Sequence, residues 1–240
     1  MHNRLERGIT KAMRMAVVTC AMFCFIAQTQ AQNPALQEKL AAIKQASAAN
    51  KQALAHYTWL EQQTISLKGE VKKTQQFQVQ MVNGQQQKTE LNPQPPAQPS
   101  GGRLKERIIE KKTEELVAYG QQIAALAKQY AQTDPQALQQ AFQQGNISMQ
   151  PNGSTGTVGL IIKSYLKPND SVTLVFSEQN KALQSVKVAT YLTDPSDAVT
   201  VAVQYAKLPD GTNHVATMQV NGVAKQLGVA IQNSNYQPKQ

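Results

Sequence analysis

The second half of the chain alternates apolar and polar residues, and this pattern constrains the fold more than any other feature. Val199, Val201, Val203 and Tyr205 form one alternating set, and similar sets recur from residue 147 onward. Successive side chains of a β-strand point to opposite faces of a sheet, so each set places its apolar side chains on one face. Turn sequences separate the sets: Pro168-Asn169-Asp170, Asp194-Pro195-Ser196-Asp197, Pro209-Asp210-Gly211 and Asn221-Gly222. Short turns between alternating sets predict an antiparallel meander over residues 146–236.

The first half of the chain predicts helices and a smaller group of strands. Residues 34–55 and 103–131 carry apolar residues at helical spacing, and a shorter helix is expected from Thr133 to an end at Gly145. Between the two long helices the period changes to two, and Asn83-Gly84 predicts a tight hairpin turn. A sheet with one apolar face needs helices to cover that face. The sequence therefore predicts an α+β fold: a curved antiparallel sheet, or incomplete barrel, covered by two long helices and one short helix.

A proline-rich segment interrupts these elements. Residues 92–102 hold four prolines and end in Ser100-Gly101-Gly102. Proline at this density fits neither a helix interior nor a central strand. The segment is expected to be a surface loop or hinge within a single domain of residues 32–240, a length suited to one core.

The N-terminus has the order of features that defines a secretory signal peptide. Positive charges at Arg4, Arg7, Lys11 and Arg14 precede a short apolar run from Met15 to Ala27, and small residues follow it. Cleavage is expected after Ala31, which makes residues 1–31 a removable signal. Two alternatives stay open: an uncleaved membrane anchor, which the short run disfavours, and lipidation at Cys20 or Cys24.

Removal of the signal would change the chemistry available to the chain. Both cysteines would leave with it, so the mature protein could form no disulfide, thiol nucleophile or thiolate metal site. Its net charge would be +6, from 20 basic and 14 acidic residues. The basic residues are spread along the chain and lack the aromatic platforms of a nucleic-acid interface, so we expect no nucleic-acid partner. A periplasmic or secreted protein without a stable membrane span is expected.

No catalytic, metal or cofactor motif is present, so we expect a non-enzymatic protein without a cofactor. His56 and His214 lack partners at metal-ligand spacing and are interpreted as surface or junction residues. A hydrolase would have to gather scattered acidic groups in one cleft. The residues available for that purpose are Glu61, Glu70, Asp194, Asp197 and His214.

Large apolar side chains near the first helix suggest a groove on the sheet. We take as candidate groove residues Tyr57, Trp59, Phe77, Met81 and Phe176. The alternative is that these side chains fill an ordinary core, where large aromatic residues are common. Whether the space between sheet and helices is open or packed is left undecided by the sequence.

The segment from Tyr57 to Glu61, leading into Ile65 to Glu70, resembles the first strand pair of periplasmic carriers of outer-membrane lipoproteins. The order of helix, strands, helices and long meander behind a signal peptide is similar to theirs. That resemblance implies a half-open barrel with a helical lid over an apolar cavity. It leads us to expect an exported binding or carrier protein for an apolar ligand such as a lipid or acyl chain. The alternatives are an envelope interaction protein with a filled core and an uncharacterised hydrolase.

Overall fold

The computed structural model describes residues 34–91, 93, 103–131, 135–151, 156–179 and 182–239. The expected signal peptide and most of the proline-rich segment therefore lie outside the described residues. The chain divides into two compact units, Met1–Gln37 and Glu38–Gln240, and the elements below belong to the second unit apart from the start of the first helix. No helix among the described residues is long and apolar enough to span a membrane.

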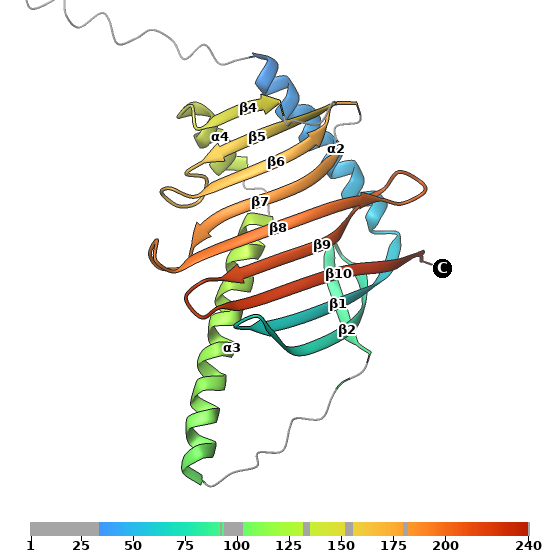
Figure 1. The fold of residues 1–240 in the computed structure, drawn as a ribbon. Coiled ribbons are helices and arrows are strands. Elements are labelled where there is room, and N and C mark those ends of the chain that lie inside the picture. The colour runs from blue at the N-terminus through green and yellow to red at the C-terminus, as the bar shows by residue number, and fades with distance from the viewer. Residues whose placement is uncertain are drawn as a thin grey trace, which may run out of the picture. The chain divides into compact units, whose positions relative to one another are not determined.

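The second unit is built on one ten-stranded antiparallel sheet, which confirms the expected sheet (Figure 1). The strands are β1 (Tyr57–Leu67), β2 (Glu70–Val82), β3 (Gln85–Glu90), β4 (Ile147–Pro151), β5 (Thr157–Lys163), β6 (Ser171–Ser177), β7 (Leu183–Tyr191), β8 (Ala198–Lys207), β9 (Asn213–Gly222) and β10 (Leu227–Pro238). They are ordered β3-β2-β1-β10-β9-β8-β7-β6-β5-β4 across the sheet, which is open with β3 and β4 at its edges. Pairing of β1 with β10 joins the N-terminal strands to the meander.

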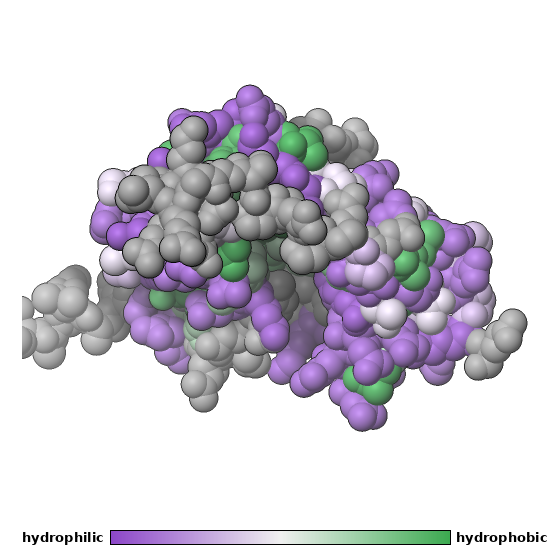
Figure 2. Space-filling view, turned by 90° about the horizontal axis from the view of Figure 1, so that it is seen from below, coloured by the Kyte–Doolittle hydropathy of each residue, from purple (hydrophilic) through white to green (hydrophobic). Residues whose placement is uncertain are grey.

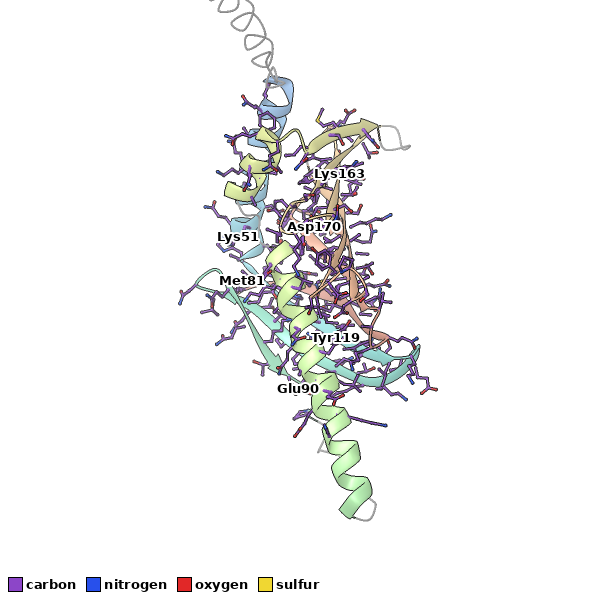
Figure 3. All side chains as sticks on the ribbon, turned by 90° about the vertical axis from the view of Figure 1, so that its left-hand side faces the viewer. Lys51, Met81, Glu90, Tyr119, Lys163 and Asp170 are labelled. Atoms are coloured by element: carbon purple, nitrogen blue, oxygen red, sulfur yellow. The ribbon has the colours of Figure 1, made fainter. Side chains whose placement is uncertain are left out.

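Three helices accompany the sheet in the described part of the chain: α2 (Pro34–Leu54), α3 (Arg103–Ala131) and α4 (Pro135–Gln143). Figure 3 shows α3 and α4 on the same side of the sheet. The side chains that α3 buries recur at helical spacing and comprise Tyr119, Ile123, Leu126, Ala127 and Tyr130. Near the C-terminal end of α2, the Asn50 side chain exchanges two hydrogen bonds with the backbone of Asn213, at 2.6 and 2.8 Å.

Gly222 brings α3 close to the sheet. The sequence predicted a turn at Asn221-Gly222, which is wrong: β9 continues through both residues, and the turn to β10 follows them. A Cβ atom at Gly222 would lie 2.6 Å from Cε1 of Tyr119. The glycine is therefore required by the close packing of a helix against a strand, a signal that resembles a turn when only the sequence is read.

Asp170 anchors the loop between β5 and β6 to α3. Its carboxylate is 1% exposed and accepts hydrogen bonds from the backbone N–H groups of Tyr165, Leu166 and Lys167. The Tyr130 hydroxyl of α3 donates to the same carboxylate at 2.5 Å. A buried carboxylate with four donors fixes both the loop and the end of the helix.

Candidate functional site

The face of the sheet that contacts α3, here called the inner face, carries its side chains in rows that cross the strands. One of these rows is apolar on every strand from β4 to β9. Its members are all buried: Ile147, Ile162, Val172, Val188, Val201 and Val220. This row is the covered part of the core.

The next row on the inner face, here called the central row, is equally apolar and less covered. Its members pair in register across seven strands: Met149, Leu160, Leu174, Val186, Val203, Met218 and Ile231. Leu160 and Val203 are buried, and the other five are only half-buried. In the view of Figure 2 the surface is largely hydrophilic, with hydrophobic residues in separate patches. The central row is therefore an apolar strip of which five side chains are partly exposed.

The central row ends in polar side chains where the sheet passes from β10 to β1. Ile231 pairs with Gln63, and Gln63 pairs with Gln75 on β2. Next to Gln63 on the inner face, Glu61 is 3% exposed and accepts a hydrogen bond from the Gln63 amide at 2.6 Å. Lys88 of the edge strand β3 reaches over β2 to the same carboxylate, at 2.5 Å. The lysine side chain is 31% exposed and the glutamate side chain 4%, so this ion pair lies at the boundary between solvent and interior.

Three aromatic rings on β1, β9 and β10 pack together near Glu61. Trp59 stacks on Tyr236 with ring centroids 5.3 Å apart, and the His214 ring lies 4.1 Å from Tyr236. Asn235 adopts a left-handed backbone (φ 52°) in the part of β10 where its pairing with β1 shifts register. Such irregularities redirect side chains in a strand. Burial, and then the negative charge of Glu61, raise the pKa of Tyr236 well above its usual range.

Two buried polar atoms, one on β1 and one on β10, have no hydrogen-bond partner among the described residues. They are the indole Nε1 of Trp59, a donor, and the side-chain Oδ1 of Asn233, an acceptor. Trp59 is 1% exposed, and Asn233 pairs directly with Glu61 across the strands. A buried donor or acceptor without a partner costs about 1–3 kcal/mol, so such atoms usually have a role. The group of Trp59, Glu61, Lys88, Asn233 and Tyr236 is called the polar cluster below.

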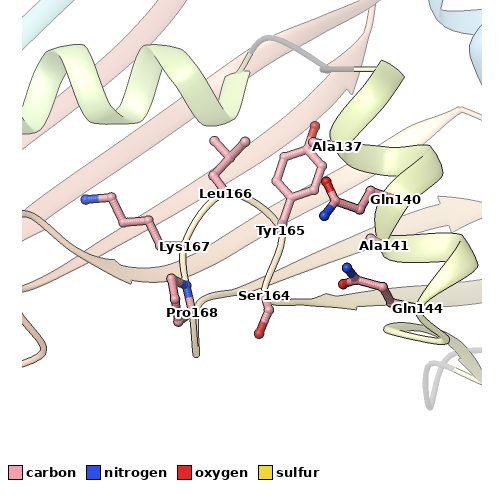
Figure 4. Close-up of a pocket in the computed structure, with 9 residues that line it drawn as sticks. All are labelled: Ala137, Gln140, Ala141, Gln144, Ser164, Tyr165, Leu166, Lys167 and Pro168. Carbon is pink, nitrogen blue, oxygen red and sulfur yellow. The ribbon is translucent and has the colours of Figure 1, made fainter.

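A separate pocket of about 310 Å³ lies between α4 and the loop between β5 and β6 (Figure 4). Gln140 and Gln144 of α4 face Ser164 across it. Lys167 is the one lining residue with a charge, and its ammonium group is held by the carbonyl oxygens of Tyr191 and Leu192 at 2.6 Å. The pocket mixes apolar and neutral polar side chains and offers no free charge, so it is a weaker candidate than the inner face.

The structure brings together four of the five predicted groove residues. Tyr57, Trp59, Phe77 and Met81 lie on the neighbouring strands β1 and β2, where Trp59 pairs with Val79 and Phe77 with Glu61. Phe176 lies on β6, five strand spacings from β1, or about 24 Å along the sheet. The groove itself stays a prediction. The sequence pattern did not predict the central row as a continuous feature, nor Lys88, Asn233 and Tyr236 as site residues.

The acidic residues that a hydrolase would need are placed on different parts of the sheet. Glu70 is exposed in the β1–β2 hairpin with Lys72, while Asp194 and Asp197 lie in the β7–β8 turn. His214 is 8% exposed and packs on Tyr236, so its interpretation as a surface or junction residue is wrong. His56 is exposed at the junction of α2 and β1. No group of three or more His, Cys, Asp and Glu among the described residues could hold a metal ion.

Comparisons with known proteins find likeness in architecture alone. No protein-family model matches the chain. No curated protein matches it. A crystal structure of a DUF1329 family protein from Desulfovibrio piger superposes with a TM-score of 0.41 at 12% identity, covering 83% of this chain and 92% of that one. A LolA superfamily protein from Nitrosomonas europaea superposes with a TM-score of 0.38 at 8% identity, covering 83% and 93%. The weak resemblance to lipoprotein carriers expected from the sequence is thus found at the level of architecture, and it extends to no ligand or activity.

Proposed function

We propose that this chain is an exported, non-catalytic binding protein of the periplasm, and that it holds the alkyl chain of an amphiphile along the central row. The observation that carries the proposal is the in-register row of seven apolar side chains, five of them half-buried, on the inner face of an open sheet. The export signal expected at residues 1–31 supports the location.

The dimensions and energetics of the central row suit an alkyl chain. Six strand spacings separate β4 from β10, which corresponds to about 29 Å along the sheet. Each methylene group removed from water on this strip would contribute about 0.8 kcal/mol. A chain of ten or so methylenes would therefore have enough favourable free energy to offset the loss of its own freedom on binding.

The first experiment asks whether the protein carries or takes up such a ligand. Protein purified gently from the cell envelope is analysed by native mass spectrometry, with lipid extraction of the same sample. We expect bound or added single-chain lipid in one-to-one complexes. Absence of both, together with a central row fully packed in a crystal structure, would support the filled-core alternative and contradict the proposal.

Substitutions at two neighbouring residues of β9 test whether the alkyl chain binds on the central row. Met218→Lys places a charge within the central row, whereas Gln219→Lys places the same charge on the opposite, exposed face of β9. We expect Met218→Lys to weaken alkyl binding by at least about tenfold, because a charge buried against a chain costs more than about 1.4 kcal/mol. Gln219→Lys should bind like the parent protein. Equal affinities for the two variants, both folded by circular dichroism, would exclude the central row as the site.

A further inference from the structure

We infer that the polar cluster is the head-group site of this amphiphile and that it selects a zwitterionic head with one ammonium group and one phosphate group. The inference rests on the proposed function, because it assumes that an alkyl chain occupies the central row.

The polar cluster adjoins the end of the central row, where the alkyl chain is proposed to lie. The central row passes from Ile231 on β10 to Gln63 on β1, and Glu61 is the next residue of β1 on the same face. Residues two apart in a strand are separated by about 7 Å. A chain lying on the row with its head toward β1 therefore brings that head to the ion pair of Glu61 and Lys88.

The charges of the cluster favour a head that carries both signs. Glu61 is almost fully buried, and its one cationic partner among the described residues is Lys88. A purely anionic head that paired with Lys88 would leave the Glu61 carboxylate buried and unpaired. A purely cationic head that paired with Glu61 would displace Lys88. Breaking a buried pair is costly when one charge is left alone. A zwitterionic head pairs its ammonium group with Glu61 and its phosphate with Lys88. The charges of both protein side chains then stay paired.

The two unpartnered atoms complement the same head. Asn233 Oδ1 is an acceptor next to Glu61 and suits the N–H groups of a primary ammonium. Trp59 Nε1 is a donor on the same strand as Glu61 and suits a phosphate oxygen. The cluster thus offers one anion, one cation, one acceptor and one donor, which are the counterparts of a phosphoethanolamine head.

Lys88 gives access to this site. It lies on the short edge strand β3, and its side chain is 31% exposed. The ammonium group of Lys88 occupies the position on Glu61 that the ammonium group of the ligand would take. Exchange then requires Lys88 to turn toward the phosphate, a rotamer change that an exposed edge residue makes easily.

Three amphiphiles with the same alkyl chain and different head groups test whether the polar cluster selects the head group. Dodecyl phosphoethanolamine, dodecylammonium and dodecyl phosphate are titrated into the full-length mature protein by calorimetry, below their micelle concentrations. We expect the zwitterion to bind about tenfold more tightly than either half of its head alone, which corresponds to about 1.4 kcal/mol. Equal binding of all three would overturn the inference and leave the proposed function standing, whereas binding of none would overturn the proposed function.

Single substitutions should shift the preference in opposite directions. Lys88→Gln leaves Glu61 as the sole charge and should favour dodecylammonium over the zwitterion, while Glu61→Gln should favour dodecyl phosphate. Glu70→Gln and Lys72→Gln alter the exposed ion pair of β2 and serve as controls that keep the parent preference. Lys88 is the more exposed of the pair, so Lys88→Gln tests the inference even where Glu61→Gln lowers the yield of folded protein. If Lys88→Gln kept the parent's preference among the three amphiphiles, the polar cluster would not select the head group.

Discussion

The inner face of this sheet is divided into two halves of opposite character. Strands β4 to β10 supply apolar rows on which α3 packs, whereas β1 to β3 carry glutamines and charged residues beside the buried Trp59 and Val79. In this polar half, the Gln75 amide donates a hydrogen bond across the strands to the Glu90 carboxylate at 2.7 Å. The backbone ladder is continuous across both halves because its hydrogen bonds do not depend on the side chains. One sheet can therefore carry an apolar strip and a polar end in adjacent strands.

The largest effect is expected where α3 is tied to the apolar half. Asp170→Ala removes an acceptor shared by the Tyr130 hydroxyl and three backbone N–H groups in the interior. We expect a loss of about 3 kcal/mol in the free energy of unfolding, because several donors lose their partner. Denaturant titration measures this loss.

The control for Asp170 is another turn aspartate. Asp194 accepts from the backbone N–H and the hydroxyl of Ser196 at the exposed β7–β8 turn. Asp194→Ala should cost far less stability than Asp170→Ala, since water replaces the lost bonds there. Similar losses for both variants would contradict a special anchoring role for Asp170.

Close packing of α3 against the sheet predicts that two glycine substitutions change the stability of the fold in opposite directions. Gly222→Ala places a Cβ atom 2.6 Å from the Tyr119 ring and should destabilise the fold by about 1–3 kcal/mol. In Gly120→Ala, on α3 itself, the new Cβ atom lies 3.4 Å from Leu227, so the gain in helix propensity should stabilise the fold by up to about 1 kcal/mol. Thermal unfolding of the two variants decides the point. Destabilisation by Gly120→Ala would mean that α3 tolerates no displacement from the sheet.

A double-mutant cycle compares the two ion pairs of the polar half. Glu61 and Lys88 lie partly inside, whereas Glu70 and Lys72 are 74% and 50% exposed. Replacing each residue by Gln, singly and together, should give a coupling of about 1–2 kcal/mol for the inner pair and a clearly smaller coupling, screened by solvent, for the outer pair. Denaturant midpoints supply the four free energies of each cycle. Equal coupling would show that Lys88 holds Glu61 no more firmly than a surface contact does.

The two halves also differ in how well the sequence predicts them. Alternation and turn residues predicted the antiparallel sheet, and Asn83 and Gly84 have the positive φ angles expected of their hairpin (50° and 75°). The polar cluster was not predictable in the same way. Its members come from β1, β3 and β10, and their meeting depends on the register of β1 against β10, including an irregularity near Asn235. Glu61 stood out in the sequence as an acid beside an aromatic strand, but no local signal pairs it with Lys88.

The smallest effect concerns alkaline pH in the apolar half. Burial, and then the hydrogen bond to Asp197, raise the pKa of the Tyr119 hydroxyl to about 12 from an ordinary value of 10.0. Between these two values the unfolded chain releases the proton while the folded protein keeps it, so the free energy of unfolding falls as pH rises through this window. Below pH 10 the contribution is fully present. In Tyr119→Phe the melting temperature should be lower at neutral pH, since the bond to Asp197 is lost, and should fall less steeply between pH 10 and about 12. If the melting temperature of both proteins fell equally with rising pH, the alkaline sensitivity would belong to other groups. Tyr236 in the polar half, whose pKa is also raised by burial, would be tested next by Tyr236→Phe.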